Sequence, residues 1–257
     1  KGNFLNRLIF DEILSTFLIN SKIRKTIKKI KKSKKKFNNN GINKITNKIG
    51  FDLTKDQLVA IDQINNDLKS NQKMFRLLQG DVGSGKTIVA LIASMNVISS
   101  GFQVCLMAPT EILAKQHYNL VKKLFDRNIN IKILTSKTEF KERKNILRDL
   151  DNNKINILIG TQSLFQEKIK YRNLGLVIID EQHKFGVKQR KKLSDKGGKN
   201  CDVLVMSATP IPRTMIMTIF GDMDVSIIKS KPKNRKEITT LSKSSIRLDY
   251  LLWLRWY

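Results

Sequence analysis

The stretch Gly80-Asp81-Val82-Gly83-Ser84-Gly85-Lys86-Thr87 lies between a strand-like run at residues 75–79 and a helix-like run at residues 86–98. It fits the pattern Gly-x4-Gly-Lys-Thr in a strand-to-helix turn, which is typical of a phosphate-binding loop. Glycines in such a loop permit positive φ and let phosphate oxygens reach backbone N–H groups. The start of the next helix adds the positive end of its dipole. The stretch therefore predicts an α/β fold with a nucleotide-phosphate site.

Two side chains of this loop are expected to carry chemistry. Lys86 is predicted to reach the β- and γ-phosphates, and Thr87 to place its hydroxyl on Mg²⁺. The alternative is a glycine-rich turn without a ligand, which the strand–helix context disfavours. The residues predicted from the loop to bind nucleotide are Gly80, Asp81, Val82, Gly83, Ser84, Gly85, Lys86 and Thr87.

A second motif supplies the carboxylates that a phosphate loop needs. The apolar run at residues 174–179 ends in Asp180 and Glu181. Ligands of a parallel sheet bind at the carboxyl ends of its strands, so these acids are well placed. Asp180 is predicted to hold Mg²⁺, and Glu181 to orient and polarise the attacking water. The alternative, that both acids only end a strand, loses weight beside an intact phosphate loop. Lys86, Asp180 and Glu181 are thus the predicted catalytic residues.

Strand-like and helix-like runs alternate over most of the chain. The expected strands are residues 75–79, 103–107, 131–134, 155–159, 176–179 and 203–206, and the expected helices include residues 53–68, 86–98, 111–125 and 139–150. In the first of these helices, Thr54 and Gln57 have the spacing of a capping box. Strands rich in Val, Ile and Leu between helices predict a mostly parallel sheet covered by helices.

The first 50 residues differ from the rest, because they hold 14 basic and only 2 acidic residues in a chain of net charge +27. A helix is expected over residues 5–18, and a loop at residues 38–41. Residues 22–36 contain ten Lys or Arg and no acid. They are either a solvated helix face and disordered linker, or an arm that contacts phosphates. The overall charge reflects a bias toward Lys, Asn and Ile, or a polyanionic partner.

Other features limit the class of protein. Cys105 and Cys201 lie in strand-like runs and are expected to be buried, reduced and inert, which suits a reducing cytosol. No apolar run approaches the ~18 residues of a membrane span, so no membrane partner is expected. A metal role for His117 or His183 is disfavoured, because no further nitrogen or sulfur ligand is suitably spaced. His117 is expected to end a helix and to be satisfied by packing or a backbone hydrogen bond.

Further motifs resemble those of superfamily 2 helicases. Asp180-Glu181-Gln182-His183 resembles their acidic box, and Phe51, Thr54 and Gln57 resemble the motif whose glutamine reads adenine. The resemblance adds Gln57 to the residues expected to bind nucleotide. It implies nucleic-acid contacts at Pro109, Thr110, Glu111, Thr161 and Gln162, and coupling of hydrolysis to lobe movement through Gln182, His183, Ser207, Ala208 and Thr209.

The match is closer to the RecG branch of DNA helicases. The stretches at residues 77–87, 107–117, 180–187 and 208–214 all resemble it. The related transcription-repair coupling translocase usually has Glu where Gln182 stands and Phe where Ser84 stands. The resemblance implies a RecA-like P-loop lobe with an N-terminal helical basic extension. It also implies ATP and Mg²⁺ as cofactors, and branched DNA such as stalled forks and Holliday junctions as substrate.

The resemblance also suggests a domain organisation. Residues 1–50 are expected to be a basic helical linker from a wedge domain, residues 51–235 the ATP-binding lobe, and residues 236–257 a connector with an atypical tail. The tail is either an artificial end or an amphipathic docking segment. The wedge domain and a second RecA-like lobe are the expected protein partners, in a cytoplasmic monomer. Without them the chain is expected to bind ATP–Mg²⁺ but not to hydrolyse it quickly or to unwind DNA. The alternatives are the repair translocase and a non-enzymatic, basic nucleic-acid-binding module.

Overall fold

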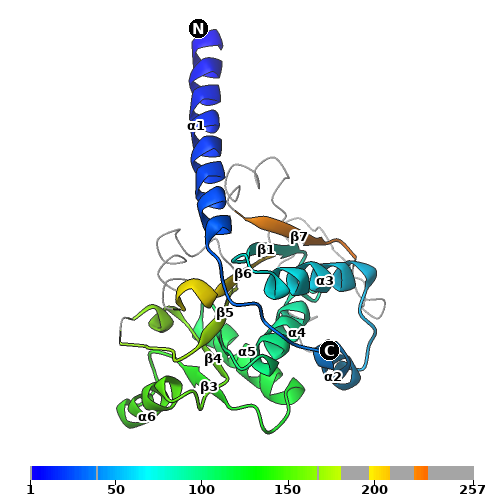
Figure 1. Ribbon diagram of the computed structural model, residues 1–257, viewed down its shortest axis with the longest axis vertical. Coiled ribbons are helices and arrows are strands. Elements are labelled where there is room, and N and C mark those ends of the chain that lie inside the picture. The colour runs from blue at the N-terminus through cyan, green and yellow to red at the C-terminus, as the bar shows by residue number, and fades with distance from the viewer. Residues whose placement is uncertain (1, 39, 167, 181–196, 209–222, 231–257) are drawn as a thin grey trace, which may run out of the picture.

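The computed structural model describes residues 2–38, 40–166, 168–180, 197–208 and 223–230 (Figure 1). Their strands form one parallel sheet in the order β3-β4-β2-β5-β6-β1-β7. The strands are β1 (Phe75–Gly80), β2 (Gln103–Met107), β3 (Ile131–Leu134), β4 (Ile157–Gly160), β5 (Leu174–Ile179), β6 (Asp202–Ser207) and β7 (Asp224–Ile228). The helices are α1 (Gly2–Lys29), α2 (Asn40–Ile49), α3 (Lys55–Lys69), α4 (Lys86–Ser99), α5 (Glu111–Leu124) and α6 (Phe140–Asp151). The predicted helix-covered parallel sheet is confirmed.

Two hydrophobic cores lie on the two faces of the sheet, because successive strand residues point in opposite directions. Leu78 and Leu106 belong to the core that α2, α3, α4 and α5 cover. Their neighbours Leu77 and Cys105 belong to the core that α6 helps to cover. Strands β2, β4, β5 and β6 are wholly buried, which explains why they appear in the sequence as largely apolar runs, whereas the edge strands β3 and β7 are only partly buried.

Helix α2 begins at Asn40, where a loop was expected. Asn favours the N-terminus of a helix as much as it favours a loop, so the cluster of Asn residues was ambiguous. At α3 the sequence was more informative. Thr54 and Gln57 form the predicted capping box, in which Gln57 N–H donates to Thr54 Oγ1 (3.3 Å) and Thr54 N–H donates to Gln57 Oε1 (2.8 Å).

Strand β7 was not predicted. It pairs with β1 in parallel, with Ile228 opposite Gly80. Its buried Ser226 interrupts the apolar pattern and is bonded by Arg76 Nη1 at 2.9 Å. Asp56, in the first turn of α3, accepts backbone N–H bonds from the two residues after the strand, and these bonds lower the pKa of its carboxyl. The strand thus depends on partners that are distant in the sequence.

Helix α1 projects from the lobe (Figure 1). The large apolar side chains of residues 4–19 in this helix are exposed. None of the described helices is both long enough and apolar enough to cross a membrane. After α1, the chain runs over the lobe, where Lys32 N–H bonds Asn71 O (2.9 Å) and Lys35 N–H bonds Leu68 O (3.2 Å).

Lys32 and Lys35 both bind Asp202, and these three residues are called the Asp202 anchor below. Each ammonium lies 2.6 Å from the carboxylate, and all three side chains are fully buried. Asp202 also accepts the Met74 N–H at 2.7 Å, so it joins the segment to the starts of β1 and β6. Desolvation lowers the pKa of Lys32 despite the nearby carboxylate. Residues 22–36 were predicted to be either solvated or an arm that contacts phosphates. Lys32 and Lys35 are neither, because both are buried and paired with Asp202.

Candidate functional site

Strand order brings the predicted site residues to one edge of the sheet. All the strands are parallel, so the phosphate loop, Asp180, Ala108 and Thr161 follow strands that end on the same side. Strand β6 lies between β1 and β5, with Ser207 opposite Gln79. The end of β6 is therefore flanked by the phosphate loop and by Asp180.

The phosphate loop has a backbone that requires glycine. Gly85 has φ +84°, and a Cβ there would lie 2.2 Å from Gln57 Nε2. Gly85 also stands at the N-cap of α4 and provides no side-chain capping bond. The first N–H groups of a helix lack carbonyl partners within the helix, and they attract anions. This loop can therefore cradle phosphate oxygens.

Lys86 is folded back onto the loop. Its Nζ donates to Gly80 O at 2.7 Å and to Asp81 O at 2.9 Å, and the side chain is buried. The neighbouring Ser84 Oγ is also buried and has no hydrogen-bond partner among the described residues. Lys86, this hydroxyl and the helix start form a donor set that fits a polyphosphate. The hydroxyl of Thr87 and the carboxylate of Asp180 are oxygen ligands of the kind that Mg²⁺ takes.

Gln57 contacts the phosphate loop directly. Its Nε2 donates to Ser84 O at 2.8 Å, while its Oε1 serves the capping box of α3. The side chain is fully buried. Gln57 therefore braces the loop, a role that the sequence did not suggest, although the Thr-x-x-Gln spacing of the capping box was a signal for its orientation. Its predicted contact with adenine stays a prediction.

Asp180 is held by β2 and α5. Its N–H donates to Met107 O (2.9 Å), and its Oδ2 lies 2.8 Å from His117 Nε2. His117 is buried, as expected, but the prediction that it ends a helix was wrong, since it lies within α5, and its hydrogen-bond partner is a carboxylate rather than the backbone. The sequence could not reveal the contact, because the two residues are separated by 63 positions and meet only through the tertiary fold.

The predicted nucleic-acid contacts lie along the same edge. Thr110 caps α5, accepting the Leu113 N–H at 3.3 Å. Glu111 accepts the Ser136 hydroxyl at 2.5 Å, and this bond lowers the pKa of the Glu111 carboxyl. Thr161 and the exposed Gln162 follow β4. Ala108 N–H donates to Gly160 O at 2.9 Å, so the segment of Pro109 and the segment of Thr161 are adjacent.

The remaining predicted residues are only partly described. Ser207 is buried at the end of β6, and Ala208 is partly exposed. Glu181, Gln182, His183 and Thr209 lie outside the described residues, as do residues 236–257.

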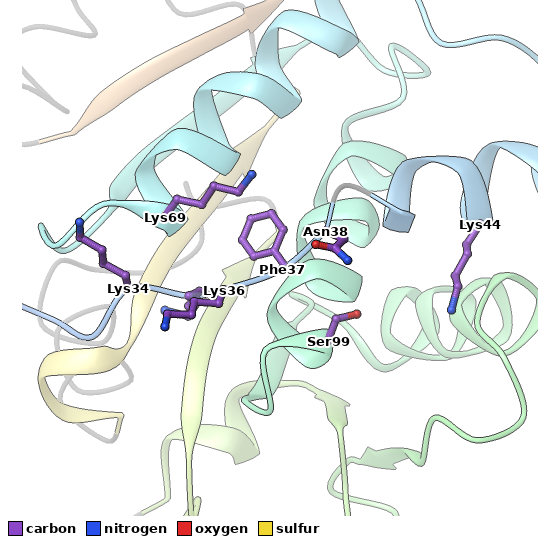
Figure 2. A pocket seen from close by; sticks show the side chains of 8 residues that line it. Lys34, Lys36, Phe37, Asn38, Lys44, Lys69 and Ser99 are labelled. Atoms are coloured by element: carbon purple, nitrogen blue, oxygen red, sulfur yellow. The ribbon is translucent and has the colours of Figure 1, made fainter.

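A basic cavity of about 610 Å³ lies elsewhere, at the end of α4 farthest from the phosphate loop (Figure 2). It is lined by Lys34, Lys35, Lys36, Phe37, Asn38, Lys44, Lys69 and Ser99. Lys69 Nζ lies 4.8 Å from the centre of the Phe37 ring. Helices α3 and α4 both end here, and helix C-termini carry partial negative charge. The lysines therefore complement the helix ends, so this cavity is a weaker candidate for phosphate than the loop.

The carboxyl ends of the strands carry a phosphate loop, an acidic strand end and exposed turns. This arrangement is that of a nucleotide-binding lobe of the helicase type. Residues 54–218 match the family model described as DEAD/DEAH box helicase. The chain belongs to this family.

Individual RecG helicases are similar to this chain over most of its length. The chain is 46% identical over 236 residues to the ATP-dependent DNA helicase RecG of Aquifex aeolicus, covering 91% of this chain and 30% of that protein. It is 44% identical over 248 residues to the RecG helicase of Bacillus subtilis, covering 96% and 36%. The structure of RecG bound to a three-way DNA junction matches with a TM-score of 0.84 and 40% identity, over 97% of this chain and 34% of that one. The chain thus spans about a third of the length of these relatives.

Proposed function

We propose that this chain is the ATP-binding lobe of a RecG-type motor that remodels branched DNA, such as stalled forks and Holliday junctions, during recombination and repair. The observation that carries the proposal is a braced, glycine-dependent phosphate loop in a chain 46% identical to a RecG helicase. The RecG structure with a three-way junction supports branched DNA as the substrate class.

The described side chains suggest how the lobe would handle ATP. Lys86 exchanges its two carbonyl partners for β- and γ-phosphate oxygens, which offer a stronger, charge-assisted bond. Thr87 and Asp180 hold Mg²⁺, which when bound neutralises phosphate charge. Glu181 orients and polarises the water, and Gln57 holds the loop in shape. Two stretches would couple the presence of the γ-phosphate to movement of the rest of the motor. They contain Gln182 and His183, and Ser207, Ala208 and Thr209.

DNA would lie along the sheet edge that bears Pro109, Thr110, Glu111, Thr161 and Gln162. Hydroxyl and backbone N–H contacts to phosphates carry no sequence information, so binding is sequence-neutral and weakens with salt. A second RecA-like lobe would close the site and supply an arginine finger. A wedge domain would cover the exposed apolar side chains of α1. The motor is proposed to act as a monomer in the bacterial cytoplasm.

The assay is binding of a fluorescent ATP analogue to the 257-residue chain with Mg²⁺ present. Lys86→Ala is expected to weaken binding at least tenfold, since a buried, charge-assisted phosphate contact is lost. Lys154→Ala is the control, because Lys154 is an exposed lysine at the opposite end of the sheet. A wild-type chain that does not bind the analogue, or a Lys86→Ala variant that binds equally well, refutes the proposal.

A further inference from the structure

The contact between His117 and Asp180 joins two regions that the proposed function uses separately. His117 belongs to α5, which begins at the proposed DNA contact, whereas Asp180 belongs to the proposed metal site. The side chains are only 9% and 13% exposed, and His117 Nε2 lies 2.8 Å from Asp180 Oδ2. An ionised carboxylate can only accept, so the Nε2–H group is the donor.

Helix α5 makes a rigid connection between these regions. Thr110 caps the helix, and His117 lies about 10 Å further along it at 1.5 Å per residue. Between them, Ala114 is fully buried against the core. A displacement of the helix N-terminus therefore moves His117 with it.

The main chain provides a second connection. Asp180 N–H donates to Met107 O, and Met107 ends the strand that leads into Thr110 and α5. Asp180 is thus held through its backbone by the end of β2 and through its carboxylate by α5. Both supports belong to the segment that is expected to contact the DNA backbone.

We propose that His117 is a positioning residue, which holds Oδ2 of Asp180 and so orients the carboxylate that would serve Mg²⁺, and which links the metal site to DNA bound at Thr110. The proposal rests on the proposed function, since it assumes that Asp180 serves Mg²⁺. Hydrogen-bonding partners of metal-binding side chains orient those ligands, and their loss typically costs 10–100-fold in metal affinity or activity.

The test is how strongly Mg²⁺ enhances the affinity of the chain for an ATP analogue, taken as the ratio of Kd without and with Mg²⁺. His117→Leu and His117→Ala, which lack the donor, are expected to lower this ratio about tenfold and to leave the Mg²⁺-free Kd unchanged. His117→Gln keeps an N–H at similar reach and is expected to restore most of the ratio. Asn119→Ala, an exposed change on the same helix, is the control.

A second measurement tests the link to DNA. Saturating three-way-junction DNA is expected to change the Kd for the Mg²⁺–nucleotide complex in the wild-type chain and in His117→Gln, but not in His117→Leu. Binding linkage requires the nucleotide to change DNA affinity by the same factor. If DNA leaves the wild-type Kd unchanged, or changes it equally in His117→Leu, the link is wrong.

The outcomes separate the two proposals. A wild-type chain that does not bind the analogue refutes the proposed function. A wild-type chain whose Mg²⁺ enhancement persists in both donor-free variants refutes the role of His117. Circular dichroism monitors folding, and if neither donor-free variant folds, His117 is a structural residue and the inference is rejected.

Discussion

Asp202→Asn gives the strongest test of the Asp202 anchor. The substitution keeps the size of the side chain and an oxygen that can accept the Met74 N–H, but it removes the charge that neutralises Lys32 and Lys35. Both ammonium groups lie 2.6 Å from the carboxylate with no solvent exposure, so neither can turn to water without moving the chain. Breaking a buried ion pair by removing one partner costs about 3–5 kcal/mol.

Lys32→Met is expected to behave differently. Desolvation outweighs the attraction of Asp202 and lowers the pKa of Lys32, so the charged form is disfavoured at this position. Removing it leaves Lys35 and Asp202 as a balanced pair, at the loss of the bonds from Lys32 Nζ to Asp202 and to Asp67 O. Because no buried charge is left without an opposite charge, Lys32→Met is expected to cost less than Asp202→Asn.

Urea unfolding followed by circular dichroism measures both effects. A loss of about 3 kcal/mol lowers the urea midpoint by roughly 1 M or more at an unchanged m-value. Asp224→Asn is the control, because it removes a carboxylate from a partly exposed ion pair with Arg24 and should cost at most about 1 kcal/mol. The reasoning is refuted if Asp202→Asn unfolds within 1 kcal/mol of the wild type, or if Lys32→Met is as destabilising as Asp202→Asn.

Two further predictions concern the phosphate loop and the thiols. Gly85→Ala is expected to destabilise the chain by more than about 1 kcal/mol and to weaken ATP-analogue binding, because it adds a collision with Gln57 to an unfavourable positive φ. Gly101→Ala shares the positive φ without the collision and should retain binding; equal losses of binding would contradict the role of the Gln57 contact. Burial raises the pKa of Cys201 to about 12, so its thiol should react with a disulfide reagent only in urea, and rapid reaction of the folded chain would argue against this burial. Because the pKa of Cys201 is higher in the folded chain, the contribution of its protonated thiol to stability is complete below pH 9.0 and is lost as the pH rises toward 12. Urea midpoints measured across that range should show this loss in the wild type, and Cys201→Ala should abolish it.

The strand-to-helix turn at the phosphate loop was predictable because its determinants are local. The glycine spacing, the strand-like run before the loop and the helix after it all fall within 25 consecutive residues. The capping box of α3 was likewise visible from Thr54 and Gln57 alone. Strand β7 was not, because its five residues include the polar Ser226, which is accommodated by hydrogen bonds with the side chains of Arg76 and Gln63, both distant in the sequence.

The sequence by itself determined the parallel α/β fold, the phosphate loop, the acid at the end of β5 and the buried cysteines. The tertiary structure alone decided that Lys32 joins Asp202 across 170 positions, that His117 supports Asp180 and that Gln57 braces the loop. The physical reason is the range of the forces involved. Backbone conformation and apolar periodicity act between near neighbours, whereas the partner of a buried polar group depends on strand order and helix placement, which no local spacing encodes.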